Sequence, residues 1–175
     1  MPFRALNLSP QIVQAVHDAG YTEPTPIQIA AIPLILAGHD VIGIAQTGTG
    51  KTAAFVLPIL MKLAASKLNG QTRGPRALVV APTRELVLQI EENVRAYAKH
   101  IPLRMATVFG GVSERPQIEA LRSGVDLAVA TPATFDVKTG GDNAPWMAVA
   151  TVPWLHVTSP TSAQVGDGKI GRAHV

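Results

Sequence analysis

One stretch, residues 45–52, restricts the possible folds more than any other part of the chain. It follows a short apolar run at 41–44, which predicts a strand, and it precedes a helical pattern at 53–63. A strand, a glycine-rich turn and a helix in this order form a cradle whose backbone N–H groups and helix dipole bind phosphate oxygens. The predicted phosphate-binding loop consists of Ala45, Gln46, Thr47, Gly48, Thr49, Gly50, Lys51 and Thr52.

The residue types within this loop predict separate chemical roles. Gly48 and Gly50 let the backbone approach a ligand closely, Lys51 would reach the β- and γ-phosphates, and the Thr52 hydroxyl would ligate Mg²⁺. The strict form of the pattern begins with glycine, where this chain has Ala45. The remaining Gly-Lys-Thr sequence between a strand and a helix still favours a phosphate-binding loop over an ordinary glycine-rich turn.

A dinucleotide-binding turn is the alternative on the same residues. Gly48, Gly50 and Ala53 fit its relaxed pattern, which requires an acidic residue about 20 positions further on to hold a ribose. The chain has no Asp or Glu between Asp40 and Glu85, and lysines and arginines are frequent in that interval. The sequence therefore favours a polyphosphate ligand over NAD.

Beyond the loop, short apolar segments alternate with helical patterns. Strands are predicted at 77–81, 104–109 and 125–131, and Thr83 is expected to cap the helix that follows the first of them. This alternation predicts an α/β fold with a parallel, doubly wound sheet and the phosphate-binding loop at its carboxyl edge.

Composition limits the class of protein. With 175 residues, 47% of them hydrophobic, the chain is long enough for one domain with a real core. It has no cysteine, and its net charge of +3 leans mildly towards anionic partners. No signal pattern is present, and no apolar run approaches the roughly 18 residues that span a bilayer. We therefore expect a soluble, cytoplasmic protein without a membrane partner.

Several further motifs stand in a characteristic order around the loop. The segment 20–28 reads Gly-Tyr-Thr-Glu-Pro-Thr-Pro-Ile-Gln, and Phe3 lies 17 residues before Gly20. Pro-Thr-Arg-Glu-Leu follows at 82–86, then a glycine pair, then Thr-Pro at 131–132. Together these motifs closely resemble the first RecA-like domain of DEAD-box RNA helicases, and the resemblance covers about three-quarters of the chain.

The resemblance implies ATP as the nucleotide and assigns an adenine-sensing element. Gln28 matches the glutamine that reads adenine, and a carboxamide offers the donor and the acceptor that this base needs. Phe3, Pro24 and Thr25 match the rest of that element. Taken without the other motifs, these residues fit a structural alternative equally well, in which Thr25 only caps a helix and Gln28 is a solvated side chain.

The resemblance also implies contacts with RNA. The matching residues are Pro82, Thr83, Arg84, Gly110, Gly111, Thr131 and Pro132. Such contacts go to the RNA backbone, so binding is expected to be independent of base sequence and sensitive to salt. For the glycine pair, a plain turn is the structural alternative.

The family pattern breaks after residue 132. Ala133 and Thr134 replace the Gly-Arg of the family, and the Asp-Glu-Ala-Asp motif that should follow is absent, so no catalytic residue is identifiable. The second RecA-like domain is also absent. An intact relative would unwind RNA with ATP, whereas this chain is expected to bind nucleotide weakly without hydrolysing it.

The last part of the chain, residues 133–175, differs in amino-acid composition from the rest. It is rich in Gly, Pro, Thr and Ala, and one short strand is predicted at 147–152. The final seven residues can be encoded by a common sequencing-library adapter. We therefore expect a partial helicase domain at 1–132, followed by an irregular or artefactual tail.

Two other functional classes remain open. One is a different phosphate-loop enzyme, such as a small nucleotide kinase, although this would not explain Phe3 or Gln28. The other is a non-catalytic module that binds ATP or RNA. The sequence does not distinguish RNA targets or oligomeric states.

Overall fold

The structure is a computed structural model that describes residues 2–66, 74–132 and, for the backbone, 147–150. The chain divides into two compact units. A helical unit comprises Met1–Lys67 and Glu92–Pro102, and a sheet unit comprises Leu68–Glu91 and Leu103–Val175. The boundary falls within helix α4 (Arg84–Tyr97), which contributes residues to both units.

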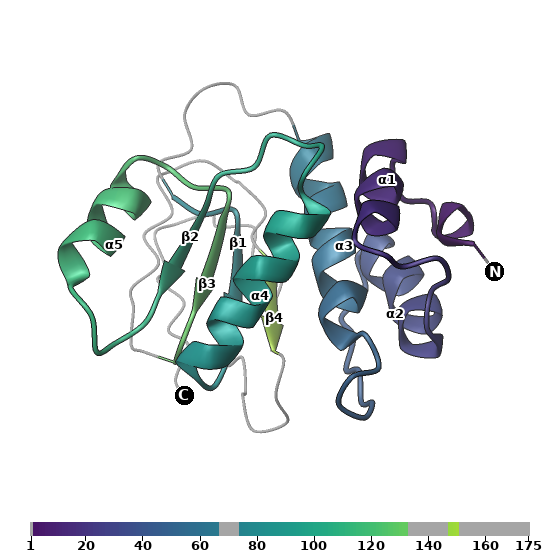
Figure 1. Cartoon of the computed structure of the whole chain (residues 1–175), viewed down its shortest axis with the longest axis horizontal. Helices are drawn as coiled ribbons and strands as arrows, with labels where there is room; N and C mark the ends of the chain where they lie inside the picture. Colours follow the sequence, from purple (N-terminus) through teal and green to yellow (C-terminus); the bar gives the residue numbers. More distant parts are fainter. Residues whose placement is uncertain (1, 67–73, 133–146, 151–175) are drawn as a thin grey trace, which may run out of the picture. The chain divides into compact units, whose positions relative to one another are not determined.

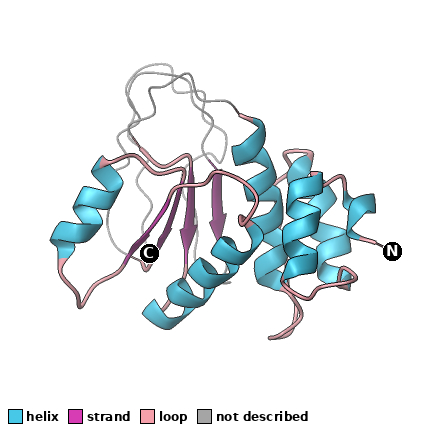
Figure 2. Cartoon of the chain, turned by 45° about the horizontal axis from the view of Figure 1, so that its top comes forward, coloured by secondary structure: helices cyan, strands magenta, loops and turns pink. Residues whose placement is uncertain are grey.

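The helical unit is built from short helices around an apolar core (Figure 1). Its elements are the 3₁₀ helix η1 (Phe3–Leu6), α1 (Pro10–Asp18), α2 (Pro26–Leu36), α3 (Lys51–Ala65) and the end of α4. Figure 2 shows α2 and α3 among these packed helices. The side chains of Ile12, Ile32, Leu57 and Leu60 are fully buried and supply much of the driving force for folding of this unit.

Ser-Pro at 9–10 and Thr-Pro at 25–26 predict helix starts and Gly38 predicts a helix end, and the structure confirms these boundaries. Ser9 caps α1 by accepting a hydrogen bond from the Ile12 N–H at 3.4 Å, and Pro10 occupies the first helical position. Gly38 follows the end of α2 with a φ of 89°, a backbone conformation that L-residues rarely adopt. Start and stop signals of this kind act within a few residues, so they are readable from the sequence.

The described residues of the sheet unit form four strands (Figure 1), and their parallel pairing confirms the prediction of a parallel sheet. They are β1 (Ala77–Val80), β2 (Met105–Val108), β3 (Leu127–Ala130) and β4 (Met147–Ala150), in the order β2-β3-β1-β4. All four residues of β3 are buried, which is typical of an inner strand in a parallel sheet. Helix α5 (Glu114–Arg122) packs near β2, and the first half of α4 also belongs to this unit.

A buried carboxylate joins the strands at their amino-terminal ends. Asp126 precedes β3 and is 8% exposed. Its Oδ1 accepts a hydrogen bond from the Arg76 guanidinium at 2.9 Å, and its Oδ2 accepts one from the Arg104 backbone N–H at 2.9 Å. Arg76 precedes β1 and Arg104 precedes β2, so one side chain fixes the relative register of three strands.

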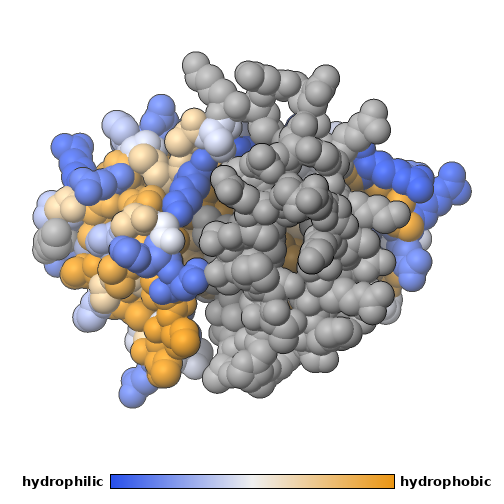
Figure 3. Space-filling view, turned by 180° about the vertical axis from the view of Figure 1, so that it is seen from behind, coloured by the Kyte–Doolittle hydropathy of each residue, from blue (hydrophilic) through white to orange (hydrophobic). Residues whose placement is uncertain are grey.

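The predicted strand at residues 41–44 is wrong. This segment forms no strand, and the side chains of Ile42 and Ile44 are 92% and 89% exposed. A strand needs a partner for its backbone hydrogen bonds, and among the described residues this segment pairs with none. Figure 3 shows apolar surface on the helical unit, to which these residues belong.

Two smaller expectations can also be compared with the structure. The helical period predicts a buried face of α4 made of Leu86, Ile90, Val94 and Tyr97. The last three are buried, whereas Val87, at 0% exposure, is buried in place of the partly exposed Leu86. The predicted strand at 147–152 is confirmed as Met147–Ala150, while 151 and 152 lie outside the described residues. The sequence predicts that the phosphate-binding loop lies at the carboxyl edge of the sheet. The loop belongs to the helical unit and the sheet to the other unit, so this position stays a prediction.

Candidate functional site

The predicted phosphate-binding loop leads directly into α3. Gly50 is the residue before the helix, and both Gly48 and Gly50 have positive φ values, 81° and 83°. A side chain in this region of φ is strained, which explains both glycines. The Thr49 hydroxyl donates a hydrogen bond to the Gln46 carbonyl at 2.7 Å and tightens the turn.

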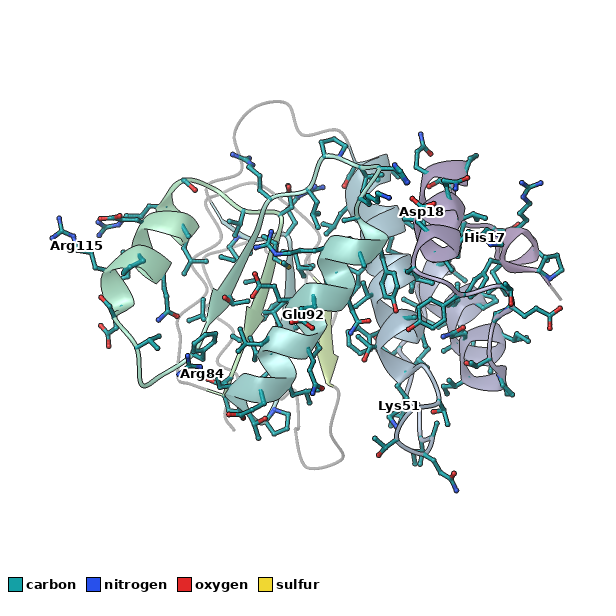
Figure 4. All side chains as sticks on the ribbon, in the orientation of Figure 1. His17, Asp18, Lys51, Arg84, Glu92 and Arg115 are labelled. Carbon is teal, nitrogen blue, oxygen red and sulfur yellow. The ribbon has the colours of Figure 1, made fainter. Side chains whose placement is uncertain are left out.

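Lys51 closes the loop on itself. Its ammonium group donates hydrogen bonds to the carbonyl oxygens of Ala45 at 2.5 Å and Gln46 at 2.6 Å. Figure 4 shows Lys51 at the beginning of α3, beside this loop. Phosphate oxygens carry charge and are stronger acceptors than neutral carbonyls, so a phosphate group can compete for these donors.

Gln28 connects α2 to the same loop. Its Nε2 donates a hydrogen bond to the Gly50 carbonyl at 3.1 Å, and its Oε1 accepts one from the Thr25 N–H at 3.0 Å. The side chain is only 1% exposed. A Cβ on Gly50 would lie 2.3 Å from Gln28 Nε2, so the contact requires glycine at position 50.

The rest of the predicted adenine-sensing element lies in the same unit, with mixed accessibility. Thr25 and Gln28 form a capping box at the start of α2, but its Thr25 half falls short of a hydrogen bond and leaves Oγ1 buried without a partner in the described structure. Pro24 is buried, and Phe3 is a core residue at 1% exposure. The unsatisfied hydroxyl beside the loop fits a polar ligand, whereas an adenine contact by Phe3 stays a prediction.

The first predicted RNA-binding segment connects β1 to α4. Thr83 caps the helix, as predicted, because its Oγ1 accepts a hydrogen bond from the Leu86 N–H at 3.3 Å. Hydrogen bonds from its own backbone N–H and from the Thr83 hydroxyl hold the pKa of the Glu85 carboxyl below its usual value. Arg84 is exposed at the start of α4 (Figure 4), and its guanidinium lies 4.8 Å from the centre of the Phe109 ring.

The glycine pair follows β2 in an exposed turn. Gly111 has a φ of 80°, which explains that glycine from the backbone alone. Gly110 has no such φ, and a Cβ added there would meet no atom within 4 Å. Nothing in the described structure therefore requires glycine at position 110, which leaves the close approach of an external molecule as a reason for it.

The parallel sheet brings the three predicted RNA-binding segments to one edge. Val80 at the end of β1 and Val108 at the end of β2 are both in register with Ala130 at the end of β3. The segments that begin at Pro82, Gly110 and Thr131 follow these three strand ends within two residues, and the Thr131 N–H donates a hydrogen bond to the Val108 carbonyl at 2.9 Å. The three segments therefore lie at the same edge of the sheet.

Two contacts at this edge were missed by sequence reasoning. Phe109, beneath Arg84, was interpreted only as the end of a strand, and Gln117 on α5 was not singled out. Gln117 hydrogen-bonds to the backbone of Phe109 at both its N–H and its carbonyl. The Gln117 side chain reaches back eight residues, and no local pattern indicates such a bond.

Other kinds of site are not evident in the described part of the chain. Residues 2–66 and 74–132 contain no group of three His, Asp or Glu residues that could hold a metal ion. Within the described ranges, no helix is long and apolar enough to cross a membrane. The residues that follow β4, at 151–175, lie outside the described residues.

Comparisons with known proteins agree with the motifs. Residues 25–147 match the DEAD/DEAH box helicase family. The chain is 45% identical over 130 residues to DEAD-box ATP-dependent RNA helicase 30 of Arabidopsis thaliana, and 44% identical over 131 residues to ATP-dependent RNA helicase DeaD of Mycobacterium tuberculosis. Each alignment covers 74% of this chain and 22% of the relative, so the chain spans about a fifth of the length of these proteins.

Solved structures give the same result. The RNA helicase Prp28 from Chaetomium thermophilum, determined with bound ADP, is 45% identical with a TM-score of 0.67, over 75% of this chain and 33% of that one. A DEAD box protein from Methanococcus jannaschii is 34% identical with a TM-score of 0.68, over 75% of this chain and 35% of that one. The RecA-like fold, the motifs and the sequence identity together place this chain in the DEAD/DEAH box helicase family.

Proposed function

We propose that this chain is an ATP-binding lobe of the kind used in ATP-dependent RNA unwinding, and that alone it binds nucleotide weakly without hydrolysing it. The observation that carries the proposal is the hydrogen bond from Gln28 to the Gly50 carbonyl. It joins the predicted adenine-sensing helix to the predicted phosphate-binding loop. Residues for the two ends of a nucleotide are therefore in direct contact.

The residues in contact fit the parts of ATP. Lys51 and the backbone N–H groups of residues 46–52 would bind phosphate oxygens, and the Thr52 hydroxyl would ligate Mg²⁺. Gln28 and Thr25 would bind adenine, assisted by Phe3 and Pro24. When bound, Mg²⁺ would neutralise phosphate charge next to Lys51.

RNA is proposed as the second ligand. The segments at the carboxyl edge of the sheet offer Arg84, the N-terminus of α4 and two exposed glycines. These groups suit phosphate and sugar contacts rather than reading of base edges, so binding should not depend on base sequence. RNA binding should weaken as the salt concentration rises. Binding releases counterions from the RNA phosphates, and this release is less favourable at high salt.

Hydrolysis is not expected from this chain alone. In-line attack on a γ-phosphate requires a group that orients water and cations that stabilise the transferred phosphoryl group. The 175 residues contain no Asp-Glu-Ala-Asp motif to supply them. Bound ATP should therefore persist.

The experiment is a titration of the chain with a fluorescent ATP analogue, together with a phosphate-release assay. Lys51→Ala should weaken binding at least about tenfold, since it removes a charged hydrogen-bond donor. Lys62→Ala, further along the same helix, is the matched control and should leave affinity unchanged. Unaltered affinity in Lys51→Ala would refute the site, and phosphate release that Lys51→Ala abolishes would refute the lack of hydrolysis.

A non-catalytic module that binds ATP or RNA is the second candidate. It is favoured by the lack of an Asp-Glu-Ala-Asp motif within the 175 residues. RNA retained through purification, with nucleotide bound but no turnover, would support this role. ATP hydrolysis stimulated by added RNA would exclude it.

A further inference from the structure

A single side chain on α5 holds both ends of the glycine turn. The Gln117 Oε1 atom accepts a hydrogen bond from the Phe109 N–H at 2.9 Å. Its Nε2 atom donates to the Phe109 carbonyl and to the Ser113 carbonyl, each at 3.2 Å. The two hydrogens of the amide and one lone pair of its oxygen are thus all used to tie the backbone from Phe109 to Ser113, with Gly110 and Gly111 between them.

This turn receives little support from its own side chains. Gly110 and Gly111 are exposed and have no side chains to pack, and a Cβ added at either would meet no atom within 4 Å. Glycine also loses more conformational freedom on folding than other residues do. The hydrogen bonds from Gln117 therefore restrict a segment that would otherwise sample many conformations.

The same hydrogen bonds reach a second RNA-binding segment through Phe109. The Arg84 guanidinium lies 4.8 Å from the centre of the Phe109 ring, within the range of a cation–π interaction. Fixing the Phe109 backbone at both its N–H and its carbonyl limits where the ring can lie. Gln117 thereby influences the position of Arg84 without touching it.

We propose that Gln117 is a positioning residue for RNA binding, which sets the conformation of the Gly110–Gly111 turn and, through Phe109, the place of Arg84. The inference rests on the proposed RNA surface at the carboxyl edge of the sheet. Gln117 is uncharged and only partly exposed. It acts by preorganising the groups that bind, which lowers the ordering cost of association.

The test uses the full chain, a short fluorescent oligouridine and three variants. Gln117→Met keeps the length of the side chain but removes all three hydrogen bonds. Gln117→Glu keeps an acceptor for the Phe109 N–H and loses both donors. Gln11→Met, at an exposed position on α1, is the matched control. Amide hydrogen exchange at Phe109, RNA affinity and ATP-analogue affinity are measured for each.

Gln117→Met should accelerate amide exchange at Phe109 and weaken RNA binding about three- to tenfold, because only part of the ordering supplied by the three lost hydrogen bonds is carried over to RNA binding. Its affinity for the ATP analogue should not change. The slope of log Kd against log salt should also stay constant, because no cation is removed, whereas Arg84→Met should reduce that slope by about one. Gln117→Glu should weaken RNA binding as well, because its second carboxylate oxygen would face the two carbonyl oxygens that Nε2 binds. Gln11→Met should behave as the parent chain.

Each alternative outcome has a definite meaning. Faster exchange at Phe109 with unchanged RNA affinity would overturn the proposal and leave the RNA surface intact. If the parent chain binds no RNA at any salt concentration, the proposed RNA function fails, while exchange at Phe109 still reports on the hydrogen bonds. If Gln117→Met also loses ATP-analogue binding, that variant has unfolded. Amide exchange at Phe109 in the parent chain then decides, because an unprotected Phe109 amide there would refute the assigned hydrogen bond.

Discussion

The contact between Gln28 and Gly50 gives a prediction whose magnitude can be worked from the structure. In Gly50→Ala the added Cβ would lie 2.3 Å from Gln28 Nε2, too close for the carboxamide to stay. Gln28 is buried and held at its other end by the Thr25 N–H, so it cannot shift without losing hydrogen bonds. The φ of 83° adds strain for any residue with a Cβ.

These effects sum to a measurable loss of stability. Strain at a positive φ costs about 1 kcal/mol, and a buried carboxamide deprived of its partner costs about 2 kcal/mol. Gly50→Ala should therefore lower the free energy of unfolding by about 3 kcal/mol. Gly48→Ala is the matched control: its φ is 81°, but a Cβ there meets nothing within 4 Å, so only the strain of about 1 kcal/mol applies.

Urea unfolding followed by circular dichroism measures both values. A double-mutant cycle then isolates the contact, because Gly50→Ala in a Gln28→Ala background should cost only about 1 kcal/mol of strain. Equal losses for Gly50→Ala and Gly48→Ala, or an unchanged cost of Gly50→Ala in the Gln28→Ala background, would refute the reasoning.

Three further predictions concern other parts of the chain. Asp126→Ala should lower the free energy of unfolding by about 3 kcal/mol, because it removes the carboxylate that pairs with the largely buried Arg76 guanidinium. Urea unfolding measures this change, and a loss below about 1 kcal/mol would contradict the prediction. Gly110→Ala should leave stability almost unchanged while weakening RNA affinity, and equal affinities in a titration with oligouridine would contradict a close approach there. Hydrogen bonds from Lys99, then Gln14 and His100, lower the pKa of Asp18, so its contribution to stability is present above the unfolded-state pKa of about 4 and is lost as the pH falls below it. Thermal unfolding of Asp18→Asn should show a weaker loss of stability on acidification than the parent chain, and identical pH profiles would count against this.

Local signals explain which parts of the fold were predictable. The helix starts at Ser9 and Thr25 and the stop at Gly38 depend on neighbouring residues, and the structure confirms them. The apolar segments at 77–81 and 125–131 became strands because the sheet supplied partners on both sides. Residues at 41–44 have the same apolar character without a partner, and pattern alone cannot reveal that difference.

The same distinction between local signals and long-range contacts applies to the candidate site. The loop residues from Ala45 to Thr52 were predicted from their order, because phosphate binding needs those residue types in immediate succession. The hydrogen bond between Gln28 and Gly50 spans 22 residues and depends on how α2 packs against α3. The contact of Arg84 with Phe109 likewise depends on the pairing of β strands, so neither could be derived from spacing.

The most direct test of the central claim is the ratio of ATP to GTP affinity, measured by competition against the fluorescent analogue, in the parent chain and in Gln28→Ala. The ratio isolates recognition of the base, since any disturbance of the phosphate-binding loop affects both nucleotides alike. The proposed function predicts a clear preference for ATP in the parent chain that disappears in Gln28→Ala. A preference for ATP that survives in Gln28→Ala would contradict the assigned role of Gln28 and favour a different phosphate-loop enzyme, such as a nucleotide kinase.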